Sequence, residues 1–262
     1  MGGFHSGELA VQERAGVRHL AQRLGTMLAP PDLSGGAWAQ RIQRSLAGRD
    51  LAVITARDRD GRLWTSPLVA HAGFLDGYNA LLHVNALPHK GDPLHDLPAG
   101  QQIGMVAIDF GARRRMRVNG LLTRVDGGLH IEVEQAYGNC PQHINPDHRL
   151  PPAPHPSITD RSALIETADT FFLGTIHPVR GADASHRGGE AGFVHLDGDD
   201  LWWNDLPGNN MFNSLGNIAA NDEAALLFLD FDTGARLHLS GRAEIEWRGQ
   251  DRRVRFRVEA KK

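Results

Sequence analysis

The sequence predicts a mainly β protein with a few helices, built as two tandem copies of one small barrel. The first observation is an internal repeat: segment 108–110, Ile-Asp-Phe, returns as segment 229–231, Leu-Asp-Phe, and Asp230 minus Asp109 gives an offset of 121. Upstream, segment 84–88 matches segment 203–207 at an offset of 119. The second observation is the dominance of short strand patterns separated by turn signals. Two copies of one fold can pack as dimer subunits do, so we expect a pseudo-dimer.

Two helical patterns precede the strands of the first copy. Apolar residues recur at helical spacing over residues 8–24 and again over residues 38–46, and a loop rich in proline and glycine separates them. Alternating or β-branched runs then predict strands at 51–56, 63–70, 80–85, 103–110, 115–125 and 129–135.

A proline-rich linker, residues 141–156, leads to a short helix at 162–168 and to the second copy. Strands are expected there at 171–176, 192–196, 200–204, 224–231, 236–247 and 253–258. We therefore divide the chain into an N-terminal helical extension (1–36), a first copy (37–140), a linker (141–160) and a second copy (161–262).

The composition excludes several classes of protein. Net charge is -3, so no overall basic field indicates a nucleic acid or membrane partner. Cys140 is the only cysteine, which fits a reducing compartment, and no secretion signal opens the chain, so we expect a cytoplasmic protein. Motifs of serine hydrolases, NTPases, Rossmann enzymes and metalloproteases are missing. Cys140, His143, His148 and His155 match no zinc spacing, so no metal is predicted.

The sharpest local signal is segment 183–189, which holds Ser185, His186, Arg187 and Gly188. A guanidinium beside a hydroxyl, followed by glycines that let a ligand approach the backbone, suits a phosphate or a polar ring edge. A solvated turn is the alternative interpretation.

A second segment points to the same chemistry. After Asn204, residues Asn209 and Asn210 lead into Met211, Asn213 and Ser214 at the start of a helical pattern. Asparagine is a favoured N-cap, and the free amides of a helix start attract anions. The alternative is a capped surface helix without a ligand.

The first copy lacks both features, because Ser66-Pro67-Leu68 stands opposite segment 185–187. Only the second copy therefore looks equipped as a site. Arg113, Arg114, Arg115 and Arg117 crowd a hairpin of the first copy, where we expect a solvated basic surface; the alternative is that they reach across to an anion. It follows that Arg187→Ala should weaken ligand binding more than Arg114→Ala.

These residues resemble a known family. Segments 183–189, 202–217, 226–231 and 239–244 resemble the pyridoxamine 5'-phosphate oxidase-like FMN-binding split barrels, and segments 4–8 and 137–141 resemble a subgroup with two barrel copies per chain. The resemblance implies a six-stranded split barrel per copy with FMN at the interface between barrels. The strand with Ser185, His186, Arg187 and Gly188 would lie along the flavin. Residues near the phosphate would be Asn204, Asn209, Asn210, Met211, Asn213 and Ser214.

The leading hypothesis is thus an FMN-binding flavoprotein, an oxidoreductase for an unidentified small molecule, as a monomer with internal pairing or as a homodimer. One alternative is a non-catalytic flavin or phosphate-ligand sensor. Another keeps the fold but binds a deazaflavin or haem. No side chain stands out as a catalytic acid or base.

Overall fold

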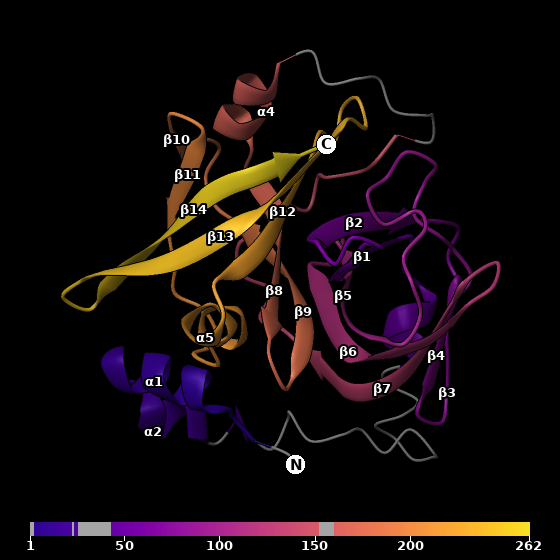
Figure 1. Cartoon of the computed structure of the whole chain (residues 1–262), viewed down its shortest axis with the longest axis horizontal. Helices are drawn as coiled ribbons and strands as arrows, with labels where there is room; N and C mark the ends of the chain where they lie inside the picture. The colour runs from indigo at the N-terminus through magenta and orange to yellow at the C-terminus, as the bar shows by residue number, and fades with distance from the viewer. Residues whose placement is uncertain (1–2, 23, 26–42, 152–159) are drawn as a thin grey trace.

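The computed structural model describes residues 3–22, 24–25, 43–151 and 160–262. It contains two seven-stranded antiparallel sheets, which make up most of its regular secondary structure (Figure 1). The fold is therefore mainly β, as predicted. No helix in the described ranges is both long and apolar enough to cross a membrane.

The two sheets share one strand order, which confirms that the halves are copies. The first runs β2-β1-β5-β6-β7-β4-β3 and the second runs β9-β8-β12-β13-β14-β11-β10. The first sheet consists of β1 (Leu51–Arg57), β2 (Leu63–Val69), β3 (Leu75–Tyr78), β4 (Leu81–Val84), β5 (Gln101–Asp109), β6 (Arg114–Val125) and β7 (Leu129–Gly138). The second consists of β8 (Thr170–His177), β9 (Gly181–Gly188), β10 (Val194–Asp197), β11 (Asp200–Asn204), β12 (Glu223–Leu229), β13 (Arg236–Arg248) and β14 (Asp251–Lys261).

The strand count corrects one expectation. The resemblance implied six strands per copy, whereas each sheet has seven. The short strand β3, which the pattern did not predict, forms a hairpin with β4 at one sheet edge. Strand β9 was also not predicted, because its apolar side chains are only those of Ala182 and Ala184 and it contains no Val, Ile, Thr, Phe, Tyr or Trp. Tertiary pairing with β8 makes it a strand nonetheless.

The helices begin and end differently from the prediction. The pattern over 8–24 indicated one helix, but α1 (Ser6–Arg14) ends before Gly16, whose φ is 70°, and α2 (Arg18–Ala21) follows. The left-handed backbone at Gly16 explains the break, since glycine adopts it without steric cost. Of the helix predicted at 38–46, residues 43–46 are helical and the rest lie outside the described residues. The predicted 162–168 helix is α4 (Arg161–Thr167).

The two copies meet through residues that are counterparts in the repeat. Phe110 and Phe231, separated by the 121-residue offset, contact each other edge to face with ring centroids 5.1 Å apart. Val106 and Leu227 share the same buried cluster, as do Ile108 and Leu229. An interface in which a residue contacts its own counterpart is the mark of two-fold packing. The chain therefore forms a pseudo-dimer, and the repeated Phe lies at its centre.

A repeated glycine explains another part of the internal match. Gly120 in β6 and Gly241 in β13 both lie where the ladder register shifts. A Cβ atom on either would come within 2.0 Å of a carbonyl oxygen of the neighbouring strand. A side chain does not fit at either bulge, which explains why both copies have glycine at this position.

The N-terminal helix packs on the second copy, against α5 (Asn213–Ala220) (Figure 1). The two backbones approach closely, because a Cβ on Gly7 would lie 2.2 Å from the Gly216 carbonyl oxygen. A Cβ on Gly216 would in turn lie 2.6 Å from the Glu8 backbone nitrogen. This contact brings segment 3–8 next to the predicted site.

Candidate functional site

The structure distributes the predicted site residues over three neighbouring places at the junction between the copies. His186, Arg187, Gly188 and Asn204 line one pocket, which we call the arginine pocket. Asn213 lines a second one, the N-terminal pocket, and Ser185 and Ser214 lie behind it. Asn209, Asn210 and Met211 form the loop before α5, where the Asn209 side chain donates to Asn139 and accepts from the Met211 amide.

The arginine pocket draws its walls from both copies. Its lining includes Arg115 of β6, His186, Arg187 and Gly188 of β9, and Trp203 and Asn204 of β11. Arg115 was expected on a solvated hairpin, and that interpretation is wrong for this residue and for Arg117. Arg113 and Arg114 are exposed, whereas Arg117 is only 8 % exposed and Arg115 is mostly buried. Strand β6 places alternate residues on opposite faces, so 115 and 117 turn toward the other copy.

Four buried nitrogen atoms of this pocket's residues have no hydrogen-bond partner within the described part of the chain. They are Arg115 Nε, His186 Nε2, Arg187 Nε and Trp203 Nε1. Buried donors are nearly always paired in native proteins, because an unpaired one costs about 1–3 kcal/mol. Such a concentration of unpaired groups around one pocket indicates a ligand that supplies acceptors.

His186 is one of these donors because of its tautomer. Arg115 Nη1 lies 2.7 Å from His186 Nδ1, and a guanidinium can only donate. Burial and the neighbouring Arg115 hold the pKa of His186 well below its usual range, so the ring is neutral. Nδ1 therefore accepts, and the single ring proton is on Nε2.

The charges around the pocket are not balanced. Arg187 pairs with Asp205 at 2.9 Å, but Asp205 also accepts from Arg252 at 2.8 Å. Arg115 has no ion pair with any described carboxylate. Its pKa is lowered to about 10 by burial and by Arg117 and Arg187, so it is still a cation at neutral pH. The pocket therefore presents uncompensated positive charge.

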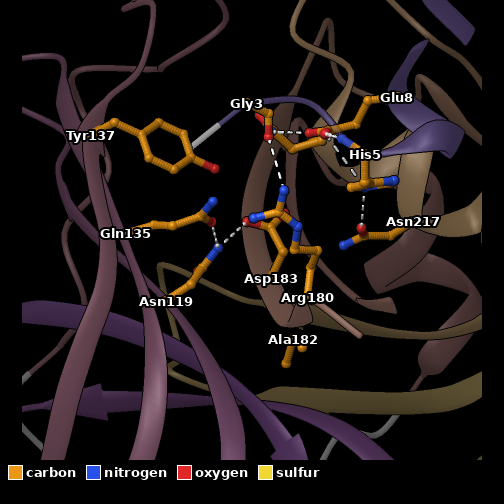
Figure 2. A pocket seen from close by; sticks show the side chains of 12 residues that line it. Gly3, His5, Glu8, Asn119, Gln135, Tyr137, Arg180, Ala182, Asp183 and Asn217 are labelled. Carbon is orange, nitrogen blue, oxygen red and sulfur yellow. Dashed lines mark hydrogen bonds and ion pairs between the residues drawn. The ribbon is translucent and has the colours of Figure 1, made fainter. Parts of the chain in front are cut away.

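The N-terminal pocket lies on the other side of this junction and is shown in Figure 2. Segment 3–8 closes it: Arg180 donates to the Gly3 carbonyl, and the His5 ring lies 3.1 Å from Asn217 Oδ1. The opposite wall is Tyr137, Gln135 and Asn119 of the first copy. The walls thus come from three parts of the chain that are far apart in sequence.

The start of α5 differs from the prediction. We expected an asparagine N-cap, but the N-cap is Phe212, which is left-handed with φ 58° and makes no side-chain cap. Asn213 instead donates to Glu8 Oε1, and the Ser214 hydroxyl donates to Asp183 and lies 3.0 Å from the Ser185 hydroxyl. The helix start is thus covered by the carboxyl group of Glu8. Sequence reasoning missed Glu8 because no local pattern links it to residue 213.

Glu8 makes the contact between α1 and α5 sensitive to pH. Burial raises its pKa from 4.5 to about 7, against the hydrogen bonds from His5 and Asn213. The folded state therefore holds the Glu8 proton more tightly than the unfolded chain does. The contribution of Glu8 to stability is complete below pH 4.5 and declines as pH rises through about 7.

We expect Glu8→Gln to stabilise the protein relative to wild type at about pH 8 but not at about pH 5, since glutamine mimics the protonated acid. Urea unfolding of both proteins at the two pH values measures the difference. Burial lowers the pKa of His5, which lies 3.6 Å from Glu8, to about 4, so its ring is neutral in the folded protein at both pH values. A pH-independent difference would contradict the assignment.

The counterpart junction in the first copy is closed. Ser66 donates to Asp92 Oδ1, and Asp92 lies 3.6 Å from His238, the counterpart of Arg117 in the repeat. Both Ser66 and His238 are buried. This junction leaves one buried donor, Arg236 Nε, and one buried acceptor, Asp92 Oδ2, without a hydrogen-bond partner among the described residues, whereas four unpaired nitrogen atoms lie at the junction formed by β9, so the two are not equivalent. Among the described residues, no three His, Cys, Asp or Glu side chains converge as metal ligands.

Comparison with known proteins agrees with the fold of the second copy. Residues 160–261 match the family model described as pyridoxamine 5'-phosphate oxidase. No curated protein matches the chain. Among solved structures, the chain is similar to a variant of HupZ from Group A Streptococcus, with 15% identity, 40% of this chain and 96% of that chain covered, and a TM-score of 0.33.

Two further solved structures are similar over a comparable part. A putative pyridoxamine 5'-phosphate oxidase from Lactobacillus delbrueckii shares 14% identity over 39% of this chain and 90% of that chain, with a TM-score of 0.31. HutZ, the haem storage protein from Vibrio cholerae, shares 11% identity over 37% and 87%, with a TM-score of 0.31. The family model thus matches residues 160–261, a range that contains all strands of the second copy, β8 to β14.

Proposed function

We propose that the protein binds FMN and is an oxidoreductase for a small molecule, with the FMN phosphate in the arginine pocket. The observation that carries the proposal is the set of four unpaired donors, Arg115 Nε, His186 Nε2, Arg187 Nε and Trp203 Nε1. A phosphate dianion has acceptor oxygens only, so it complements these four unpaired donors. The family match of residues 160–261 supports the same ligand class.

The charge of the pocket favours a phosphate over a neutral ligand. Arg115 is a buried cation repelled by Arg117 and Arg187, and a dianion would relieve that repulsion. Arg187 is held in place by Asp205, so its guanidinium is oriented before the ligand arrives. Gly188 lets the His143 carbonyl approach the end of β9, because a Cβ on Gly188 would lie 1.9 Å from that oxygen.

Bound FMN supplies hydride and electron transfer. The chain's own residues bind and orient it: Arg115 and Arg187 attract the anion, and His186, fixed as the Nε2–H tautomer by Arg115, donates from one side. The remaining residues predicted from the sequence, Asn209, Asn210, Met211, Asn213 and Ser214, stay predictions for contacts to the rest of the cofactor. We assign no catalytic acid or base.

The proposal is tested by titrating the purified protein with FMN and following flavin fluorescence and visible absorbance. Stoichiometric binding that inorganic phosphate weakens is the expected result. A protein that neither copurifies with flavin nor binds added FMN would disprove the proposal. Mass spectrometry of the ligand released on denaturation distinguishes FMN from a deazaflavin or haem.

Enzymatic turnover separates an oxidoreductase from a flavin sensor. We expect NADH or NADPH to bleach the bound flavin under anaerobic conditions and an added acceptor to restore its colour. Stable binding without reduction by either donor would favour the non-catalytic alternative.

A further inference from the structure

A large acidic groove lies in the second copy, outside both pockets of the junction. It has a volume of about 620 Å³ and is bounded by α4, the start of β8 and the turn between β12 and β13. Four aspartates line it, Asp160, Asp169, Asp230 and Asp232, and the described lining residues include no Lys or Arg. The volume falls within the range of about 300–1,000 Å³ that is common for small-molecule sites.

The first copy shows what the equivalent place in this fold contains. Asp109 is the counterpart of Asp230 at the offset of 121, and Arg49 Nη1 lies 2.6 Å from Asp109 Oδ2. The Arg49 guanidinium also donates to Ser45, and the residue is only 4 % exposed. An arginine of the chain itself thus neutralises the acid in the first copy.

The second copy has lost that arginine. In the sheets, Val53 pairs with Val106 and Phe172 pairs with Leu227, so β1 and β8 correspond at an offset of 172 minus 53, or 119. The counterpart of Arg49 is therefore Ala168, which lines the groove. Replacing arginine by alanine leaves the acid in place and opens the space that the guanidinium occupies in the first copy.

The remaining carboxylate is held as an anion. Asp230 accepts hydrogen bonds from the Thr233 hydroxyl and from the amides of residues 232 and 233. Burial alone would raise its pKa, but these bonds bring the pKa below its usual value. No described cationic side chain forms an ion pair with Asp230. The anion is thus preorganised and lacks a counter-charge.

Other groups of the groove also suit a ligand. The Thr170 hydroxyl, in a residue 2 % exposed, interacts with the Asp169 carboxyl group, whose pKa is lowered by hydrogen bonds from His148, Asn145 and Thr170 although burial alone would raise it. His148 and Phe231 stack with ring centroids 3.8 Å apart and offer an aromatic wall. His148 is itself fixed by Asp169 at 2.6 Å. Carboxylates beside an aromatic wall suit a ligand with a cationic head and a planar or apolar body.

We propose that this acidic groove binds a small organic cation with a guanidinium-like head, which takes the place of the missing Arg49 counterpart at Asp230. A planar cation with paired N–H groups matches a carboxylate in two places, as arginine does. The aromatic wall would accept its flat face or its apolar body. This inference is independent of FMN, because none of the residues that line the groove lines the arginine pocket.

Benzamidinium and benzamide form a matched pair of probes, since they have similar shapes and differ in charge. Isothermal titration calorimetry on the full chain should show benzamidinium binding at least about tenfold more tightly than benzamide. High salt should weaken the binding of the cation only. Equal affinities for the two probes would overturn the proposal.

The decisive variant is Ala168→Arg, which restores the arginine of the first copy. We expect it to abolish benzamidinium binding while the protein unfolds at the same or a higher urea concentration. Asp230→Asn should weaken binding about tenfold or more, and Asp199→Asn, an exposed acid outside the groove, should leave it unchanged. If Asp230→Asn disturbs its turn, Ala168→Arg still decides: unchanged affinity in that folded variant would refute the proposal.

Discussion

Replacing Arg115 by methionine is expected to weaken FMN binding by about tenfold to a hundredfold, the loss of one charge-assisted contact of about 1.5–3 kcal/mol. Arg115 is the buried cation of the arginine pocket that has no described carboxylate partner. Methionine keeps a flexible stem of similar length and removes the charge. Arg114→Met is the matched control, because Arg114 is the exposed neighbour on the same strand.

The same variant should not destabilise the ligand-free protein. Arg115 is repelled by Arg117 and Arg187, so its removal leaves no acid unpaired and relieves repulsion, which offsets the loss of its hydrogen bonds to the ring and carbonyl of His186. Urea unfolding without ligand and FMN titration by fluorescence quenching measure the two effects separately. If the variant bound FMN as tightly as the wild type does, Arg115 would not be part of the binding site. A variant that loses binding and stability together would assign Arg115 a structural role instead.

Arg187→Ala should also weaken FMN binding more than Arg114→Ala does, but here two effects combine. Its loss removes a donor and also leaves Asp205 with Arg252 as its remaining cation. The Arg115→Met variant is therefore the clearer test, because we expect it to weaken FMN binding without lowering the stability of the ligand-free protein. The expectation that a guanidinium of segment 183–189 contributes to the site stays a prediction.

The fold could be predicted because the repeat and the strand patterns are local features of the sequence. The central contact of the pseudo-dimer, Phe110 on Phe231, is even visible as the repeated Asp-Phe pair. The strand β9 was not recognised as one from its pattern, because an edge strand at an interface need not alternate in hydrophobicity. The boundaries predicted for the two copies stay a prediction.

The site was only partly predictable because it is assembled from both copies. Arg115 and Arg117 resemble a solvated basic hairpin in sequence, and their burial depends on the other copy packing across β6. Glu8 reaches α5 from the opposite end of the chain. The repeat alone shows that Ala168 stands where the first copy has Arg49. Only the structure shows that Arg49 forms an ion pair with Asp109, and therefore that the second copy lacks this ion pair.

Asp183→Asn is expected to lower the free energy of unfolding by about 3–5 kcal/mol, the usual cost of breaking a buried ion pair on one side. Asp183 is 2 % exposed and accepts from Arg117 of the first copy at 2.8 Å. It also accepts from Asn119 of that copy and from Ser214 of α5. Asparagine keeps the shape and removes the charge, so Arg117 would be left buried without a counter-charge.

A double-mutant cycle decides whether this pair joins the copies by charge. Arg117→Met alone should be destabilising for the converse reason, since Asp183 would then be the unpaired group. The double variant Asp183→Asn/Arg117→Met buries no charge, so it should lose less than the sum of the single losses, with a coupling of about 1–3 kcal/mol. Urea unfolding of the four proteins measures it. The surroundings leave little room for relaxation, because a Cβ on Gly104 would lie 2.5 Å from the Asp183 Cα. Additive losses would mean that Asp183 holds the junction through Asn119 and Ser214 rather than through Arg117.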